Sequence, residues 1–384
     1  MRLGSDVLFD RQLLRGRTIG LVSNPASVDA QLRHVIARAE ADEVRIGALF
    51  GPQHGFRSDL QENMIESPHE RDQRRGVPIY SLYSDTREPT SEMLAGLDAL
   101  VIDLQDVGTR IYTYIYTMAN CLRAARKAGL PVVVCDRPNP IGGLAVEGPV
   151  LEPGFESFVG LYPVPMRHGM TIGELARLFN EHFGIGAKLE VIAMQGWTRN
   201  LFADQTGLPW VLPSPNMPTL DTATVYPGSV LLEGTNVSEG RGTNRPFELV
   251  GAPWADPEAV AAALNGRGLP GVRFRPARFE PTHHKHAGRA CGGFQIHVTD
   301  RLAFRPVETG VAVIEVMRTE SGGAFRWSDP PYEYETEKPP IDILYGSRAL
   351  RDGLESGGTA ADLVRTWTPG LEAFRETRAK FLQY

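Results

Sequence analysis

The chain has 384 residues, 42% of them hydrophobic, which is enough for two domains with separate apolar cores. Its 40 basic and 46 acidic residues give a net charge of −6 without any Lys/Arg-rich run, which argues against a nucleic-acid partner. No stretch of about 18 apolar residues occurs, which argues against a membrane-spanning segment.

The first half of the chain alternates short apolar runs with helical patterns. Helices are predicted over residues 30–41 and 114–128, and a further helix begins at Thr171, which forms a capping box with Glu174. Strands are predicted over residues 18–23, 44–50, 78–82, 99–104, 131–135 and 189–193. Short β-branched strands separated by helices are typical of a doubly wound parallel sheet. We therefore predict a Rossmann-like α/β domain over residues 1–222.

The second half of the chain has a different sequence pattern, in which predicted strands are bounded by Gly and Pro. Strands are predicted near residues 272–274 and 293–298, and helices over 307–319 and 370–382. This order favours a smaller α+β domain over residues 223–384.

Residues 215–248 combine carboxylates, arginines, amides and glycines without helical or strand periodicity. A compact domain seldom keeps a long irregular segment unless it binds or catalyses, so we predict a functional loop here. Glu233, Glu239, Arg241 and Arg245 offer acid, base and anion-binding groups. The alternative is a solvated turn region rich in Gly and Asn.

Polar residues follow the end of four predicted strands, where open parallel sheets bind their ligands. Any one of them could instead cap the following helix. Neither a Gly-x-Gly-x-x-Gly fingerprint nor a P-loop is present, so no nucleotide cofactor is indicated. The polar clusters are Asn24, Gln53–His54, Gln105–Asp106 and Asp136–Arg137.

The cysteines and histidines do not suggest a metal centre. Cys121, Cys135 and Cys291 are odd in number and lack ligand spacing, which fits a reducing compartment. The cluster at residues 283–286 lacks carboxylate or Cys partners at ligand spacing, so we interpret it as an exposed loop. The first residues also lack the apolar segment of a signal peptide, and we expect a cytoplasmic protein.

Eight motifs, in this order, resemble the NamZ family, also known as DUF1343. The resemblance extends over essentially the whole chain, including residues 340–347. It implies a Rossmann-like N-terminal domain, a smaller C-terminal domain and an active site between them. It also implies an exo-β-N-acetylmuramidase, which removes N-acetylmuramic acid from the non-reducing ends of peptidoglycan fragments. The motifs lie at residues 23–25, 53–57, 103–114, 136–143, 147–149, 167–174, 214–219 and 226–248.

Glycoside hydrolysis requires two carboxyl groups beside the bond that is cleaved, one as acid and one as nucleophile or base. The candidates are Glu233, Asp106, Glu62 and Glu239. Asp106 could instead cap the following helix or pair with Arg110, and each loop glutamate could instead pair with an arginine of the same loop. Many members of the family carry Pro-Glu-His-Gly where this chain has Pro52-Gln53-His54-Gly55, and an amide cannot act as acid or base.

N-acetylmuramic acid carries a lactyl carboxylate, for which a guanidinium group is the natural partner. Arg110, Arg137 and Arg241 are the candidates for that role. The expected partner is a small carbohydrate, with no cofactor, metal, nucleic acid or membrane. Another amino-sugar or sugar-acid glycosidase remains an alternative, and the amide of Gln53 leaves open a non-catalytic carbohydrate-binding protein. Further candidate substrate ligands are Asn24, Gln53, His54, His168, Asn216 and Asn236.

Overall fold

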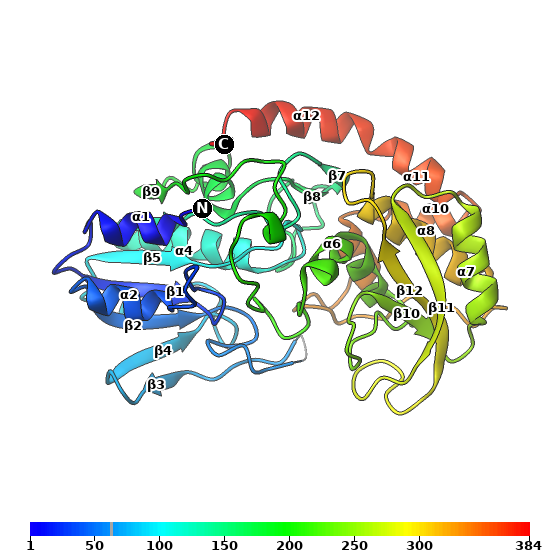
Figure 1. Cartoon of the computed structure of the whole chain (residues 1–384), viewed down its shortest axis with the longest axis horizontal. Coiled ribbons are helices and arrows are strands. Elements are labelled where there is room, and N and C mark those ends of the chain that lie inside the picture. Colours follow the sequence, from blue (N-terminus) through cyan, green and yellow to red (C-terminus); the bar gives the residue numbers. More distant parts are fainter. Residues whose placement is uncertain (62–63) are drawn as a thin grey trace.

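The computed structural model describes residues 1–61 and 64–384 and consists of two lobes (Figure 1). The N-lobe comprises the residues before helix α6, which begins at Leu220, and the C-lobe comprises α6 and all that follows. No helix in the described part of the chain has the length and hydrophobicity needed to cross a lipid bilayer.

The N-lobe is built on a seven-stranded sheet of order β3-β4-β2-β1-β5-β6-β9. All neighbouring strands are parallel except the β3–β4 pair at one edge. Strands β2, β4 and β3 are added on one side of β1, and β5, β6 and β9 are added on its other side. The direction in which strands are added therefore reverses between β1 and β5. The strands are β1 (Thr18–Ser23), β2 (Arg45–Gly51), β3 (Glu70–Asp72), β4 (Val77–Ser81), β5 (Ala99–Asp103), β6 (Val132–Cys135) and β9 (Leu189–Ile192).

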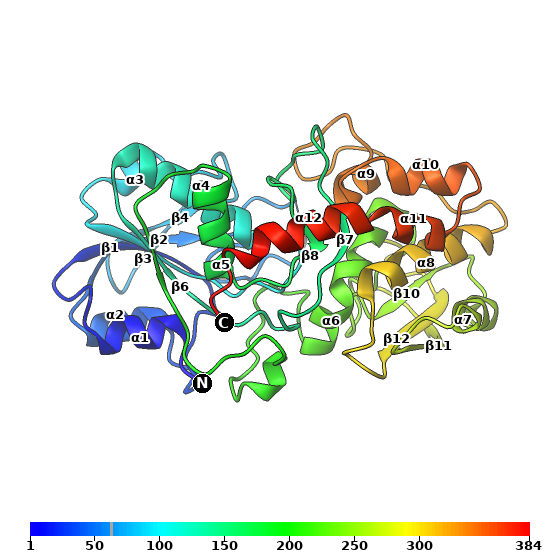
Figure 2. The same cartoon turned by 90° about the horizontal axis from the view of Figure 1, so that it is seen from above.

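Helices cover both faces of this sheet (Figures 1 and 2). Alternate side chains of β1 point to opposite faces, with Leu21 in the core beneath α1 and α2 and Val22 in the core beneath α4 and α5. The predicted sheet and the helix over 114–128 are thereby confirmed, whereas the helix predicted from residue 30 begins only at Val35. The helices are α1 (Gly4–Asp10), α2 (Val35–Ala41), α3 (Ser91–Leu94), α4 (Tyr114–Ala128), α5 (Ile172–Arg177) and the π-helix η1 (Leu178–His182) that continues α5.

The C-lobe surrounds a three-stranded antiparallel sheet of order β10-β12-β11. Its strands are β10 (Leu249–Ala252), β11 (Val272–Phe279) and β12 (Cys291–Val298). Helices α6 (Leu220–Ser229), α7 (Pro257–Gly266) and α8 (Pro306–Thr319) pack against one another or against this sheet. The remaining helices are α9 (Pro340–Tyr345), α10 (Ala349–Glu355), α11 (Ala360–Thr366) and α12 (Thr368–Ala379).

A short hairpin of β7 (Glu147–Val150) and β8 (Pro165–Arg167) lies between the lobes. The carboxylate of Glu147 accepts the backbone N–H of Glu308 at the start of α8 at 2.8 Å, where a helix favours a negative charge. Helix α12 then runs back over β7 and β8, and Arg378 donates to the carbonyls of Gly143 and Gly169 in the N-lobe at 3.1 and 3.0 Å.

The prediction of an irregular loop over residues 215–248 is wrong for its middle part. Residues 220–229 form α6, and Val230–Gly234 continue it as the 3₁₀ helix η3. Eight residues of α6 are buried, so the helix shows no polar face and no amphipathic period. Pro227 within α6 also argued against a helix in the sequence, because proline usually ends or kinks one.

Two glycines allow α6 and α8 to approach very closely. A Cβ atom added to Gly228 would lie 1.8 Å from the carbonyl oxygen of Pro306, and one added to Gly310 would lie 2.4 Å from the carbonyl oxygen of Gly228. Both added atoms would strike backbone, which cannot rotate away as a side chain does. The close contact fixes η3, which follows directly on α6 and carries Glu233.

We predict that Gly228→Ala lowers the free energy of unfolding by about 2 kcal/mol or more, because overpacking here must displace a helix. Chemical denaturation measures the effect. Gly266→Ala is the matched control, since Gly266 ends helix α7 with open space around it. The control should leave stability unchanged or raise it by up to about 1 kcal/mol. Equal effects of the two substitutions would contradict the close-packing explanation.

Candidate active site

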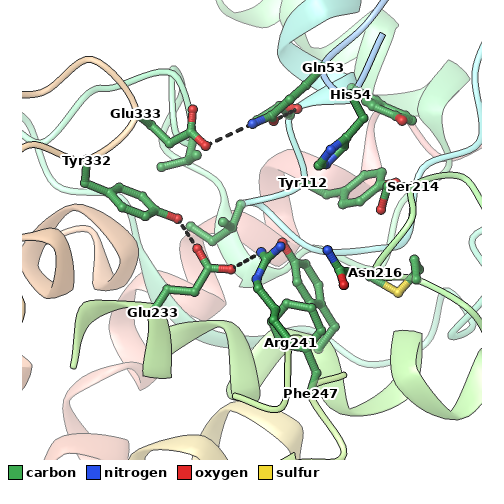
Figure 3. A pocket seen from close by; sticks show the side chains of 16 residues that line it. Gln53, His54, Tyr112, Ser214, Asn216, Glu233, Arg241, Phe247, Tyr332 and Glu333 are labelled. Atoms are coloured by element: carbon green, nitrogen blue, oxygen red, sulfur yellow. Dashed lines mark hydrogen bonds and ion pairs between the residues drawn. The ribbon is translucent and has the colours of Figure 1, made fainter. Parts of the chain in front are cut away.

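A pocket with about 470 Å³ of empty space lies at the junction of the two lobes (Figure 3). Its N-lobe wall comes from the segment after β2, the start of α4 and the segment before α6. Its C-lobe wall comes from α6, η3, the segment before β10 and the turn that contains Tyr332. The polar and aromatic lining residues are Gln53, His54, Tyr112, Thr113, Tyr114, Ser214, Asn216, Tyr226, Glu233, Arg241, Phe247, Tyr332 and Glu333.

Glu233 lies on the C-lobe side of the pocket and both of its carboxylate oxygens accept hydrogen bonds. Oε1 lies 2.5 Å from Nη2 of Arg241, and Oε2 accepts the hydroxyl of Tyr332 at 2.5 Å. The guanidinium and the phenol therefore hold the carboxylate from both sides and fix its orientation in the pocket. Glu233 is 7% exposed and thus faces the pocket rather than the solvent.

Arg241 is held between two carboxylates. Its Nε lies 3.3 Å from Oε1 of Glu239, whose carboxylate also contacts Nδ1 of His284 at 3.2 Å and Nζ of Lys285 at 3.0 Å. Burial by itself would raise the pKa of Glu239, but the charges of Lys285, His284 and Arg241 outweigh burial and lower that pKa. Glu239 therefore stays ionised and orients Arg241 from outside the pocket lining.

Glu333 lies across the pocket from Glu233, beside Gln53 (Figure 3). Its Oε1 accepts the side-chain amide of Gln53 at 2.9 Å, and its Oε2 accepts the hydroxyl of Tyr83 at 2.6 Å. Thr113 donates to the other end of the Gln53 amide at 2.8 Å and so fixes its orientation. Burial raises the pKa of Glu333, and the hydrogen bonds from Tyr83 and Gln53 oppose that rise.

The turn that carries Glu333 is locally strained. Glu333 and Tyr334 have φ angles of 46° and 71°, in the left-handed region that residues with a Cβ rarely adopt. Backbone bonds between Tyr332 and Glu335 close the turn at 2.8 and 2.9 Å. Such strain persists only where surrounding contacts enforce it, and it concentrates at functional sites.

Aromatic rings and a neutral imidazole form the rest of the wall. Tyr226 packs edge-on against Tyr112 and Phe247, with ring centroids 6.1 and 4.8 Å apart. Burial lowers the pKa of His54 to about 4, and its Nδ1 lies 2.8 Å from the carbonyl oxygen of Leu60. At neutral pH His54 is therefore uncharged and can exchange hydrogen bonds with a neutral ligand.

The structure does not bring Arg110 or Arg137 to this pocket. Arg110 is fully buried and its guanidinium donates to four carbonyls, two in the β7–β8 region and two at the end of α9. Burial lowers its pKa to about 10. Arg137 forms a two-pronged ion pair with Asp103 at 2.6 and 2.9 Å.

Four other sequence candidates also lie outside the pocket lining. Asp106 is buried, accepts the N–H of Gly108 at 2.7 Å and lies 3.3 Å from Nε2 of His168. Asn24 bonds the carbonyl of Pro213 at 2.7 Å, and Asn236 bonds the carbonyl of Ala324 at 2.9 Å. These groups hold loops in place around the site.

Glu62 lies outside the described residues. Within the described residues, the pocket brings together Gln53, His54, Asn216, Glu233 and Arg241 from the sequence candidates. The loop prediction for residues 283–286 needs correction, because His284 and Lys285 are held against Glu239. No group of three or more His, Cys, Asp or Glu side chains in the described chain is arranged to hold a metal ion.

Sequence reasoning missed Tyr332 and Glu333. The sequence did contain one sign of this site. A glutamate lies between two tyrosines directly after Pro330-Pro331, in a stretch with neither helical nor strand periodicity. Residue 333 is 280 positions from Gln53 in the chain, and only the folded structure pairs them.

A second cavity of about 780 Å³ lies at the carboxyl ends of β1, β5 and β6. Its charged lining residues are engaged within the protein, Asp29 with Arg38, Arg137 with Asp103 and Asp204 with Arg301. The remaining wall is mainly apolar and includes Trp210. Both carboxyls that line this cavity, of Asp29 and Asp204, are thus paired with an arginine, whereas Glu333 of the inter-lobe pocket has no ion pair among the described residues. The inter-lobe pocket is therefore the candidate active site.

Comparisons with known proteins give one consistent answer. Models of the N-terminal and C-terminal domains of exo-beta-N-acetylmuramidase NamZ match residues 19–221 and 224–384. Peptidoglycan beta-N-acetylmuramidase NamZ of Bacillus subtilis (strain 168) is 46% identical over 388 residues, covering 100% of this chain and 91% of the relative. Two solved DUF1343 family proteins of Bacteroides fragilis NCTC 9343 cover 100% of this chain and 98% of their own. Their TM-scores are 0.90 and 0.78, at 33% and 25% identity.

We predict that Arg110→Met lowers the free energy of unfolding by about 2–4 kcal/mol, because it leaves buried carbonyl groups without donors. Denaturant titration measures this loss. Arg15→Met is the control, because Arg15 makes an exposed ion pair with Glu43 at 2.8 Å and its removal should cost less than about 1 kcal/mol. Unchanged stability of Arg110→Met would show that water replaces the guanidinium.

Proposed function

This chain belongs to the NamZ family of exo-β-N-acetylmuramidases, and we propose that its inter-lobe pocket removes N-acetylmuramic acid from the non-reducing ends of peptidoglycan fragments. The protein is a glycoside hydrolase. The observation that carries the assignment of the site is the pair of buried carboxyl groups, Glu233 and Glu333, which face each other across one pocket.

The two carboxyls differ in their surroundings, as acid and base must. Glu233 is paired with Arg241 and accepts the hydroxyl of Tyr332, which suits a carboxylate that acts as nucleophile or base. Glu333 makes no ion pair among the described residues, and burial raises its pKa. We therefore assign both to the catalytic pair.

The shape of the site supports action at a chain end. Residues of both lobes line the pocket, from Gln53 on one side to Tyr332 on the other. A pocket walled by both lobes suits a terminal sugar, whereas a polymer that passed through the site would need a continuous groove.

Arg241 is our candidate for the lactyl carboxylate. It is the single Lys or Arg among the described lining residues. Its Nη2 contacts Glu233 and its Nε faces Glu239, and its Nη1 makes no hydrogen bond within the described residues. The Nη1 protons are thus placed to pair with an anionic substituent of the substrate.

We further propose a cytoplasmic role in the recycling of small wall fragments. The three cysteines are buried and unpaired, which fits a reducing compartment. Fractionation of cells that produce the protein tests this location.

The activity is tested with 4-nitrophenyl β-N-acetylmuraminide, from which we expect release of nitrophenol, measured by absorbance. The matched N-acetylglucosaminide lacks the lactyl carboxylate and should show a kcat/KM roughly 10- to 100-fold lower, the worth of one charge-assisted hydrogen bond. Preference for the glucosaminide would point to a glycosidase with another substrate. Binding of N-acetylmuramic acid without turnover would point to a binding protein.

We predict that Glu233→Gln lowers kcat on the muraminide by about 10²- to 10⁴-fold with little change in melting temperature, because the amide can neither attack nor accept a proton. Glu248→Gln is the control. Glu248 lies in the same segment, is buried and accepts the hydroxyl of Thr222 at 2.8 Å, but it does not line the pocket. A near-normal rate for Glu233→Gln would remove Glu233 from the catalytic pair.

A further inference from the structure

The amide of Gln53 determines which oxygen of Glu333 can carry a proton. The Thr113 hydroxyl bonds Oε1 of Gln53, so the NH₂ end of the amide faces Glu333. An NH₂ group can only donate, and Oε1 of Glu333 must therefore be an acceptor. The partner of Oε2 is the hydroxyl of Tyr83, which can donate or accept. A carboxylic O–H accepts more weakly than a carbonyl oxygen, so the NH₂ group favours the proton of a neutral Glu333 on Oε2, to which the Tyr83 hydroxyl can still donate.

On the basis of the proposed glycosidase function, we propose that Glu333 is the acid that protonates the leaving oxygen and that Gln53 is its positioning residue. Glu333 is 4% exposed and lines the pocket, so its proton is shielded from bulk water and available to a bound sugar. The two residues come from different lobes, and their contact forms only when the lobes are assembled around the pocket.

The charges around Glu333 are consistent with this role. Burial is the main cause that raises its pKa, the hydrogen bonds from Tyr83 and Gln53 lower it, Glu233 raises it and Arg241 lowers it. The other titratable groups around Glu333 in the described chain are the phenols of Tyr83, Tyr226, Tyr332 and Tyr334. Burial raises the pKa of each phenol, so they stay neutral. With Glu333 protonated, Glu233 and Arg241 cancel in charge, and the pocket can admit an anionic sugar.

The proposed step is balanced with water as the only co-reactant. The bond between the anomeric carbon and the glycosidic oxygen breaks, and its electron pair leaves with the oxygen. That oxygen takes the proton of Glu333 and departs as an alcohol. Water supplies the hydroxyl group on the anomeric carbon, and its other proton restores the one that the enzyme gave up.

A carboxylate in place of the Gln53 amide would change the acid. Two carboxyls at the 2.9 Å separation of Gln53 and Glu333 would share a single proton, because they cannot both be ionised at that distance. The loss of that shared proton would move to higher pH. Gln53 therefore sets the upper pH limit of the reaction as well as the position of the acid.

The decisive experiment compares leaving groups in Glu333→Gln. A nitrophenolate leaves without protonation, whereas the sugar alcohol of a muramic-acid–glucosamine disaccharide does not. We expect kcat on the disaccharide to fall by roughly 10²- to 10⁴-fold and kcat on the nitrophenyl muraminide by less than about 10-fold. Glu335→Gln is the control, because Glu335 lies on the same turn and pairs with Lys338 at 3.0 Å, outside the pocket lining.

Different results would refute the acid role of Glu333 and the glycosidase function. Wild-type protein that is inert on both substrates would refute the function. Active wild-type protein with equal losses on both substrates in a folded Glu333→Gln variant would refute the acid role alone. If that variant does not fold, the wild-type pH profiles decide. A loss of activity at high pH with the disaccharide that is absent with a dinitrophenyl muraminide supports the acid, and identical profiles overturn it.

Gln53→Glu tests the positioning role through the pH dependence of kcat/KM, which would not change if Gln53 had only a structural role. The high-pH limb of kcat/KM on the disaccharide should shift upward by roughly one pH unit or more. Gln53→Leu should lower kcat on the disaccharide more than on the nitrophenyl substrate, because the acid loses its orientation. An unshifted limb for Gln53→Glu would overturn the role of Gln53.

Discussion

Arg110 connects the two lobes through a guanidinium group that has no carboxylate partner among the described residues. Arg110 satisfies the carbonyls of Pro149 and Val164 on one side and of Leu344 and Tyr345 on the other, the latter pair at the C-terminal end of α9, where a helix favours a cation. Helix α9 packs against η3, where a Cβ on Gly234 would lie 2.7 Å from Ile341. Because η3 carries Glu233, the position of a proposed catalytic group depends on a bond network outside the pocket.

The candidate site shows how a protein keeps charges in a buried place. Two of its carboxylates are paired with cations: Glu233 with Arg241, and Glu239 with Arg241 and Lys285, while His284 also contacts Glu239. Glu333 has neutral donors instead, and this difference is the basis of the different roles that we propose for the two glutamates. In the proposed mechanism, the environment of each glutamate distinguishes the acid from its partner, since the residue type is the same.

Much of the N-lobe was predictable because its strands are short apolar runs with clear ends, and the cluster Gln53–His54 after β2 reached the pocket as expected. Helix α6 was hidden because a helix buried on all sides has no amphipathic period. Arg110 was predicted to bind the lactyl carboxylate of the substrate, but it donates to backbone carbonyls instead. A sequence does not show which acceptors a buried guanidinium will contact. Glu333 was missed because its partner lies in the other lobe, a contact that no local pattern encodes.

The path of α12 has a mechanical consequence. The chain crosses between the lobes once before α6 and a second time through α12, whose end is anchored by Arg378 and by the hydroxyl of Tyr384 on Asp136 at 2.8 Å. Two lobes joined by a single linker can open by a hinge motion, whereas two separate connections between them restrict both bending and twisting. From this double connection we expect the two lobes to keep a fixed spacing between Glu233 and Glu333 while a sugar enters and the product leaves.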